Sequence, residues 1–218
     1  MVRTFDAVIL DFDGTIVDTE WSEYQTVRDE YRRLGHDYPL ESFQARVGRA
    51  DGEHWSEGLV RAAGPQEDLE AIVARRRQAH ADLIEATEVR AGIVELLDRA
   101  DRRGTALAVA SSSPSFWVEG HLERRGLLPR FQVVATKDLV ERGKPWPDVF
   151  LAAADRLSID PGRCLVVEDS PNGVAAAKAA GMTCVAVPNP ITEGTDLSSA
   201  DLVLNSLDEL PWPEFDLG

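Results

Sequence analysis

Carboxylates, hydroxyls and a lysine occur at four places along the sequence, three of which directly follow apolar runs. The first run, residues 7–10, is followed by Asp11 and Asp13, two carboxylates two positions apart. If the strand predicted there continues to Asp13, both side chains point to the same side. The other three places contribute Ser111 and Ser112, then Lys144, and finally Glu168 and Asp169. Groups of these types bind phosphates and metal ions in proteins.

The gathering of carboxylates indicates a bound cation. Several carboxylates at one site repel each other unless a positive charge lies among them. Oxygen ligands without His or Cys favour Mg²⁺, which usually binds together with substrate phosphates. Lys144 can then balance the charge of a phosphoryl oxygen or of a carboxylate nucleophile. The residues therefore predict Mg²⁺-assisted chemistry on a phosphorylated small molecule.

Continuous apolar runs predict the strands that carry these groups. The runs cover residues 7–10, 106–110, 131–135, 164–167 and 183–187. Because these runs do not alternate with polar residues, they suit strands that are covered on both faces. Helical segments are expected at 91–103, from about 114, at 147–157 and at 171–180. This alternation predicts an α/β fold with a Rossmann-like, doubly wound parallel sheet, in which ligands bind beyond the carboxyl ends of the strands.

Residues 19–90 break this alternation and predict an inserted domain. Helical patterns occur at about 20–34, 40–47, 51–63 and 66–86, and no strand-like run lies between them. We therefore expect a catalytic core formed by residues 1–18 and 91–218, and an all-helical cap domain formed by residues 19–90. Asp18 and Thr19 lie where the chain leaves the core, and we expect them to serve as a hinge.

Composition limits the partners that this chain can have. It has 218 residues and a formal net charge of -15, which argues against binding to nucleic acid or to an anionic membrane surface. There is no signal-like segment near Met1 and no apolar run of 18 residues, so a cytoplasmic protein is expected. We also expect a monomer, with Cys164 and Cys184 as buried thiols.

The four places together resemble the motifs of the haloacid dehalogenase-like hydrolase superfamily. They are similar to its group with a helical cap after the first strand, which includes β-phosphoglucomutase and sugar-phosphate phosphatases. The matching segments are Asp-Phe-Asp-Gly-Thr from Asp11, the strand-end Ser111, Gly-Lys-Pro around Lys144, and Glu-Asp-Ser-Pro-Asn-Gly from Glu168. Four motifs in this order, spread over nearly the whole chain, are far more specific than any one of them.

The resemblance implies a role for each residue in phosphoryl transfer. Asp11 would attack phosphorus and become an aspartyl-phosphate, and Asp13 would act as general acid and then as general base. Ser111 and the Ser112 backbone amide would bind phosphoryl oxygens, and Lys144 would stabilise negative charge on the nucleophile and on the transferring group.

The resemblance also implies a metal site. The Asp11 carboxylate, the Asp13 backbone carbonyl and Asp169 would bind Mg²⁺. Glu168 would bind the metal directly or through water, or would only support the residues that do.

The type of reaction follows from Asp13 and from the cap. Haloacid dehalogenases and phosphonatases lack the second Asp, so Asp13 favours phosphate ester chemistry. In β-phosphoglucomutase a cap His and a cap Arg serve the mutase reaction, but this chain has Glu23 and Asp51 there, with Arg49 nearby. We therefore expect a phosphatase acting on a small metabolite such as a sugar phosphate. A phosphosugar mutase and a catalytically silent binding domain are the alternatives.

The sequence also predicts roles for polar and aromatic residues outside the four places. Cap residues expected to contact the substrate are Glu20, Trp21, Glu23, Arg49 and Asp51. Residues expected to lie at the surface or in the cap, without binding metal, are His36, His54, His80 and His121. The tryptophans Trp55, Trp117 and Trp146 are expected to pack, and Ser113 to cap the helix that starts near Pro114.

Overall fold

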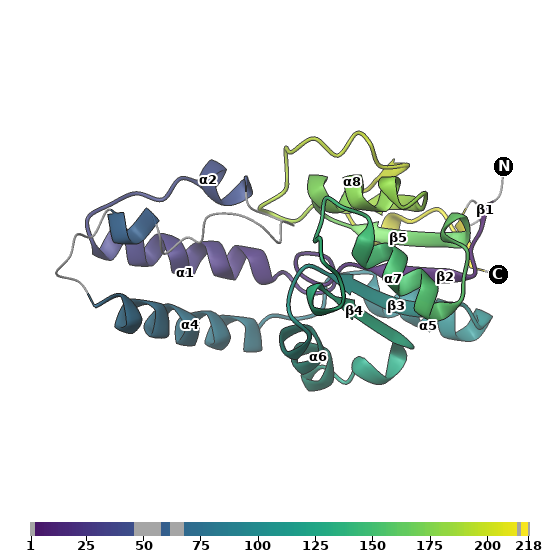
Figure 1. The fold of residues 1–218 in the computed structure, drawn as a ribbon, viewed down its shortest axis with the longest axis horizontal. Coiled ribbons are helices and arrows are strands. Elements are labelled where there is room, and N and C mark those ends of the chain that lie inside the picture. The colour runs from purple at the N-terminus through teal and green to yellow at the C-terminus, as the bar shows by residue number, and fades with distance from the viewer. Residues whose placement is uncertain (1–2, 46–57, 62–67, 213–214, 218) are drawn as a thin grey trace.

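A six-stranded parallel sheet forms the centre of the computed structural model, which describes residues 3–45, 58–61, 68–212 and 215–217. Its strand order is β4-β3-β2-β5-β6-β7 (Figure 1). The strands are β2 (Ala7–Leu10), β3 (Ala106–Ser111), β4 (Val133–Thr136), β5 (Cys164–Glu168), β6 (Thr183–Ala186) and β7 (Leu202–Val203). This arrangement confirms the predicted Rossmann-like α/β fold.

The central strand β2 fixes where a ligand can bind. Leu10 is in register with Val109 of β3 on one side and with Val167 of β5 on the other. The chain moves outward from β2 to β3 and β4, and then returns to β5 on the opposite side. The carboxyl end of β2 is thus the switch point of the sheet, where open α/β folds form their binding crevice. Asp11 follows directly after it.

Helices cover both faces of the sheet. On one face, Val8 and Leu10 belong to a core with α5 (Ile93–Arg103) and α6 (Ser115–Arg124). On the other, Ala7 and Ile9 pack with α7 (Asp148–Leu157) and α8 (Pro171–Ala179). Side chains of β2 alternate between these two cores, because successive residues of a strand point to opposite faces. This double burial explains why the strand is apolar without interruption.

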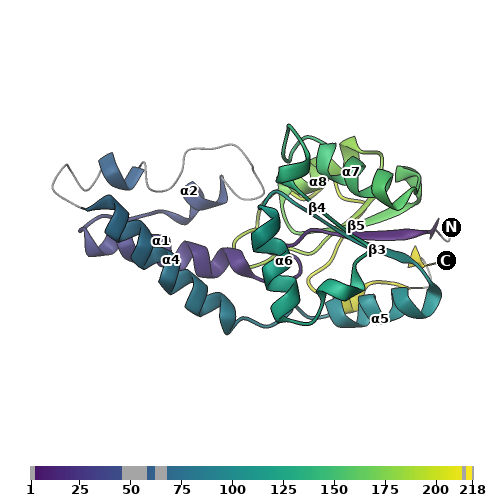
Figure 2. The same ribbon diagram turned by 60° about the horizontal axis from the view of Figure 1, so that its bottom comes forward.

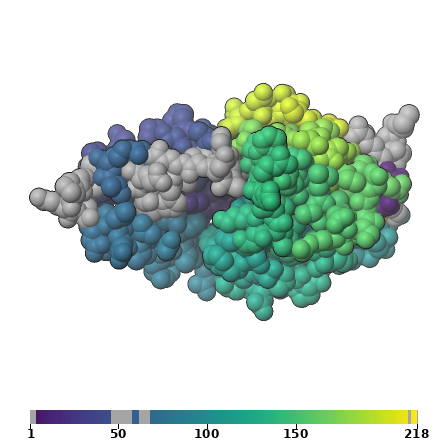
Figure 3. Space-filling model, viewed as in Figure 1, coloured from purple at the N-terminus to yellow at the C-terminus, as the bar shows by residue number. Residues whose placement is uncertain are grey.

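Helices within residues 19–85 form the cap, which lies beyond one end of the sheet (Figures 1 and 2). They are α1 (Thr19–Arg33), α2 (Leu40–Gln44) and α4 (Leu69–Glu85). The side chains of Leu59, of Val27 in α1 and of Ile72 in α4 belong to a small apolar core of the cap. In the space-filling view, the purple and blue atoms of the cap form a separate mass beside the sheet-bearing part (Figure 3). The boundaries of 19 and 90 remain our proposal for its extent.

The two chain segments that join core and cap lie side by side. Val17 forms an antiparallel bridge with Val89, and the backbone N–H of Arg90 donates to the carbonyl of Ile16 at 2.9 Å. The side chain of Asp18 accepts a hydrogen bond from the backbone N–H of Trp21 at 3.2 Å and so caps α1. The expected hinge position of Asp18 and Thr19 is consistent with this geometry and stays a prediction.

Shorter elements complete the described chain. They are β1 (Arg3–Thr4), β8 (Phe215–Asp216), η1 (Leu128–Arg130), η2 (Lys137–Leu139), η3 (Pro161–Arg163) and η4 (Leu207–Glu209). β1 and β8 pair in parallel and hold the C-terminal segment against the core. Within the described ranges, no helix is long and apolar enough to cross a membrane.

Candidate active site

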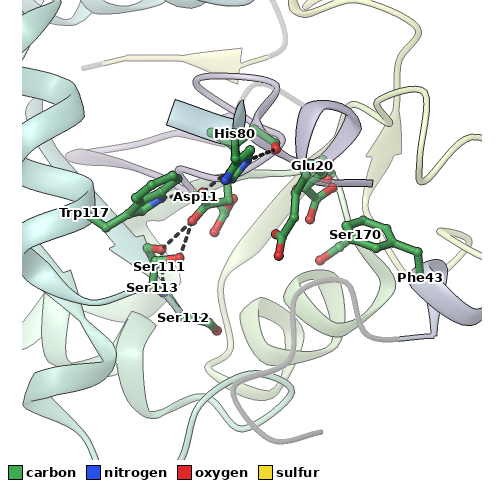
Figure 4. Close-up of a pocket in the computed structure, with 13 residues that line it drawn as sticks. Asp11, Glu20, Phe43, His80, Ser111, Ser112, Ser113, Trp117 and Ser170 are labelled. Carbon is green, nitrogen blue, oxygen red and sulfur yellow. Dashed lines mark hydrogen bonds between the residues drawn. The ribbon is translucent and has the colours of Figure 1, made fainter. Parts of the chain in front are cut away.

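The four motifs of the sequence meet at the carboxyl ends of β2, β3 and β5. Four residues there are at least 95% buried: Asp11, Ser111, Lys144 and Asp169. Beside them lies a cavity of about 190 Å³ between core and cap (Figure 4). Its lining residues are Asp11, Asp13, Thr19, Glu20, Glu23, Phe43, His80, Ser111, Ser112, Ser113, Trp117, Asp169 and Ser170. A cavity of this size suits a small metabolite better than a drug-sized ligand.

Lys144 forms a buried ion-pair cluster below the cavity. Its ammonium group contacts Asp11 Oδ1 and lies 2.6 Å from Glu168 Oε1. Burial alone would lower the pKa of Lys144, but the charges of Asp11 and Glu168 outweigh burial and raise that pKa above its usual value. Lys144 is therefore a permanent cation. Removing one partner of a buried pair like this typically costs about 3–5 kcal/mol.

Asp11 has one oxygen that is occupied and one that is free. While Oδ1 contacts Lys144, the buried Oδ2 has no hydrogen-bond partner among the described residues. Burial, together with the charges of Glu168 and Asp13, raises the pKa of Asp11 to about 8 despite the attraction of Lys144. Burial and nearby carboxylates also raise the pKa of Asp169 and that of Glu20. The floor of the cavity, formed by Asp11, Glu168 and Asp169, thus holds more carboxyl groups than Lys144 could balance if all of them were ionised.

Glu168 is fully engaged by hydrogen bonds. Its Oε2 accepts from the backbone N–H groups of Asp169 at 2.8 Å and Ser170 at 3.0 Å, and from the Ser170 hydroxyl at 3.1 Å. A Cβ atom at Gly173 would lie 1.7 Å from Glu168 Oε1, so only glycine fits there. Glu168 is built to orient Lys144 and the Asp169 backbone, which favours the supporting role over direct metal binding.

Asp13 lies in a shell of hydrogen-bond donors. Its Oδ1 accepts from Thr19 Oγ1 at 2.8 Å and from Trp117 Nε1 at 2.9 Å. Its Oδ2 accepts from Ser113 Oγ at 2.6 Å and lies 3.4 Å from Ser111 Oγ. The carboxylate is thereby held at the edge of the cavity, at the boundary between core and cap.

Asn189 was missed by the sequence analysis. Its Nδ2 donates to Asp169 Oδ2 and to Glu20 Oε2, both at 2.7 Å, and so joins the floor to the first turn of α1. A Cβ at Gly14 would lie 2.4 Å from this nitrogen, so the Asp-Gly turn must remain glycine. Asn189 lies just beyond the carboxyl end of β6, and its place after a strand was the available signal.

The cap contributes residues that the sequence analysis assigned only in part. Glu20 and Glu23 line the cavity as expected, whereas Trp21 is not among its described lining residues and stacks at a tilt on Tyr24, with centroids 5.7 Å apart. Glu23 Oε1 lies 3.4 Å from Arg76 Nη1 of α4. The predicted contacts Arg49 and Asp51 fall outside the described residues.

Two aromatic residues proved closer to the chemistry than expected. His80 is a cap residue, but it is buried and lines the cavity, with Nε2 3.2 Å from the Thr19 carbonyl. Trp117 packs, as predicted, and in addition binds Asp13 through its indole nitrogen. The periodicity of the helices gave no sign of these contacts, because both partners come from distant parts of the chain.

Two other expectations were wrong. His121 is buried rather than exposed, with its ring 4.3 Å from that of Trp117 between centroids. Ser113 does not cap the following helix: α6 begins at Ser115, whose backbone N–H donates to Asp138 at 2.6 Å. The Ser113 hydroxyl instead donates to Asp13, which adds it to the site.

Comparison with known proteins places the chain among hydrolases. The family model of haloacid dehalogenase-like hydrolases matches residues 5–181. The chain is 39% identical over 204 residues to YhcW of Bacillus subtilis, which is named provisionally as a phosphatase; the match covers 94% of this chain and 93% of YhcW. It is 30% identical over 209 residues to the validoxylamine A 7'-phosphate phosphatase of Streptomyces hygroscopicus subsp. limoneus, covering 96% and 97% of the two chains.

A solved structure is also similar over nearly the full length. It is a variant of CbbY from Rhodobacter sphaeroides in complex with xylulose-(1,5)bisphosphate. The TM-score is 0.78 at 27% sequence identity, and the match covers 95% of this chain and 96% of that chain. The similarity therefore includes the cap as well as the sheet.

Proposed function

The chain belongs to the haloacid dehalogenase-like hydrolase family and is a phosphoric monoester hydrolase, and we propose that it is an Mg²⁺-dependent phosphatase of a small sugar phosphate. We further propose that Asp11 carries the phosphoryl group between substrate and water. The observation that carries the proposal is the buried Asp11 carboxylate, which has Oδ1 against Lys144 and a free Oδ2 beside the cavity.

The proposed reaction has two steps. In the first, a bond forms between an Asp11 oxygen and phosphorus while the ester bond to the alcohol breaks, and Asp13 gives its proton to the departing oxygen. In the second, Asp13 takes a proton from water as that water attacks phosphorus and releases Asp11. Lys144, held in place by Glu168, balances the negative charge near Asp11 throughout.

Phosphate binding is assigned to the end of β3 and the residues that follow it. Ser111 is 99% buried at the cavity, and its hydroxyl accepts from the backbone N–H of Ser113 at 3.0 Å, which fixes the turn. Ser112 lines the same side of the cavity. We propose that the Ser111 hydroxyl and the Ser112 backbone amide hold the phosphoryl oxygens.

The donor set fits Mg²⁺. Asp11 Oδ2 is a buried oxygen without a hydrogen-bond partner in the described chain, and Asp169 lies across the same cavity floor. No cluster of three or more His, Cys, Asp or Glu side chains in the described ranges has the arrangement of a metal site. Two carboxylates and the Asp13 backbone carbonyl, completed by water and phosphate, suit Mg²⁺ without such a cluster. Bound there, Mg²⁺ would stabilise charge on the transferring phosphoryl group.

The cap side of the cavity supports a hydroxyl-bearing substrate. Glu20 and Glu23 offer acceptor oxygens there, and Phe43 offers an apolar surface. Carboxylates of this kind can accept hydrogen bonds from sugar hydroxyls. One similar protein is named as the phosphatase of validoxylamine A 7'-phosphate, and a variant of another was solved in complex with xylulose-(1,5)bisphosphate, which supports a phosphorylated small-molecule substrate. Glu23 in place of the mutase His favours hydrolysis over the mutase alternative.

A phosphometabolite panel with and without Mg²⁺ tests the proposal. Wild-type protein should release inorganic phosphate from sugar phosphates, lose activity with a chelator and regain it with Mg²⁺. Asp11→Asn should lower kcat by about 10⁴-fold or more, since the nucleophile is lost. Asp148→Asn is the matched control, because Asp148 pairs with Arg142 outside the cavity and should leave kcat unchanged.

Three results would contradict this function. Retained turnover in Asp11→Asn would exclude a covalent aspartyl-phosphate. Isomerisation activated by a sugar bisphosphate, without phosphate release, would identify a mutase, and no turnover by wild-type protein would favour a silent binding domain. We also propose a monomer in the cytoplasm, which size-exclusion chromatography with light scattering and cell fractionation can test.

A further inference from the structure

We propose that Trp117 is a positioning residue that orients Asp13 to protonate the leaving group. The inference rests on the proposed function, because it assumes that Asp13 is the general acid. It concerns a residue on α6, outside the four motifs that carry the chemistry in the sequence. Trp117 borders the cavity next to the serines of the β3 end (Figure 4).

The hydrogen bonds divide the two oxygens of Asp13 between different partners. Oδ1 accepts from the Trp117 indole N–H at 2.9 Å and from the Thr19 hydroxyl at 2.8 Å. Oδ2 faces the hydroxyls of Ser113 and Ser111, at 2.6 and 3.4 Å. An indole N–H can only donate, whereas a hydroxyl can donate or accept.

This division decides where the acidic proton is carried. With Trp117 donating to Oδ1, the protonated form of Asp13 keeps its hydrogen on Oδ2. The hydroxyls of Ser113 and Ser111 can then rotate to accept a hydrogen bond from that proton until Asp13 gives it up. Oδ2 lies on the side of Ser111, which we assign to the phosphoryl group, so the proton is aimed at the bond that breaks.

The indole ring is itself held on two sides. The His80 ring stacks on it with centroids 5.6 Å apart and an interplanar angle of 21°, and the His121 ring meets it edge-on at 4.3 Å and 74°. His121 comes from the same helix, whereas His80 comes from cap helix α4. Trp117 thus contacts both core and cap, and the two histidine rings together hold the indole N–H in the direction of Asp13.

A packing role alone would need the ring and not the N–H group. Trp117→Phe keeps an aromatic ring between the two histidines and removes the donor to Oδ1. Trp212→Phe is the matched control, since Trp212 packs against the sheet-bearing core with Arg99 over its ring at 4.3 Å. Trp212 is not among the described residues that line the cavity.

The test compares two esters of similar shape, p-nitrophenyl phosphate and p-nitrobenzyl phosphate. The phenolate departs without a proton, but the benzyl alkoxide needs one, so only the benzyl ester depends on Asp13 as an acid. We expect Trp117→Phe to lower kcat/KM for the benzyl ester by about 10- to 100-fold, with KM nearly unchanged. For the phenyl ester the loss should stay within about threefold.

The ratio of the two kcat/KM values is the deciding quantity, because it does not depend on the fraction of folded enzyme. Trp212→Phe should leave this ratio at the wild-type value. Equal losses on both esters in Trp117→Phe, or no loss on either, would overturn the inference and leave Trp117 as a packing residue. Wild-type protein that cleaves the phenyl ester only would also overturn it. Failure of the wild-type protein to release phosphate from both esters and from every sugar phosphate of the panel would overturn the proposed function as well.

Discussion

The floor of the cavity and the body of the cap are stabilised in different ways. On the floor, Lys144 and Glu168 are both 99% buried and form ion pairs with no access to water. In the cap, Glu30 pairs with Arg75, whose side chain is 47% exposed, and the apolar core there is small. Charge is costly to displace on the floor and less costly to change at half-exposed ion pairs of the cap such as this one. We therefore expect substitutions on the floor to change both kcat and stability, and substitutions among the half-exposed charges of the cap to change mainly the affinity for substrate.

The largest effect is expected from Lys144 on the floor. Lys144→Met would leave Asp11 and Glu168 buried without a cation, so we expect a loss of at least about 10³-fold in kcat. The free energy of unfolding should fall by about 3–5 kcal/mol. Enzyme assays and denaturant unfolding measure the two quantities.

The matched control for that change is Lys178→Met. Lys178 pairs with Asp201 and is 35% exposed, so its loss should cost no more than about 1 kcal/mol and leave kcat unchanged. Similar losses of stability for both variants would break the contrast between buried and exposed ion pairs.

An intermediate effect is expected from glycines in two core helices. Gly173→Ala places a methyl group onto Glu168, so it should destabilise the protein by about 1–3 kcal/mol and lower kcat through displaced Lys144. At Gly120 of α6 the nearest atom to an added Cβ is 3.7 Å away, on the flexible Arg124 side chain. Gly120→Ala should stabilise the protein by about 0.5–1 kcal/mol. Thermal unfolding would show whether Gly173→Ala lowers the Tm while Gly120→Ala raises it.

The smallest effect is expected in the cap wall. Glu23→Gln keeps the size of the side chain but removes a charge that faces both the cavity and Arg76. We expect about a tenfold rise in KM for a sugar phosphate with kcat little changed, since a hydrogen bond to a charged group is worth about 1.5–3 kcal/mol. Glu70→Gln, at an exposed position of α4, is the control. A large fall in kcat would show that the cap takes part in the chemistry.

Most residues on the floor of the cavity could be predicted from the sequence because they follow strands. Asp11, Ser111 and Asp169 each lie at a strand end, and parallel strands bring such ends together whatever the helices do. The family resemblance then supplied roles, which remain to be tested. Lys144 is the exception, since it precedes α7 rather than following a strand, and only its motif marked it.

The remaining residues depend on contacts that no local pattern encodes. Trp117 has the helical spacing of a packing residue, and its second function follows from the approach of Asp13, 104 positions earlier. His80 reaches the cavity because α4 packs beside α1, which the periodicity of either helix does not specify. Ser113 looked like a helix cap because capping residues and active-site hydroxyls are of the same types.

Arg90 lies at the junction between core and cap and connects this junction to the turn that follows Asp13. Its guanidinium donates to the backbone carbonyls of Gly14, Val187 and Pro188, and thereby ties the turn after Asp13 to the loop that carries Asn189. The backbone N–H of Arg90 also donates a hydrogen bond to the carbonyl of Ile16, so the two chain segments that join core and cap are held together at this residue. Any change in the angle between core and cap would therefore have to preserve the Arg90 hydrogen bonds or break them, and breaking them would also release the turn that follows Asp13.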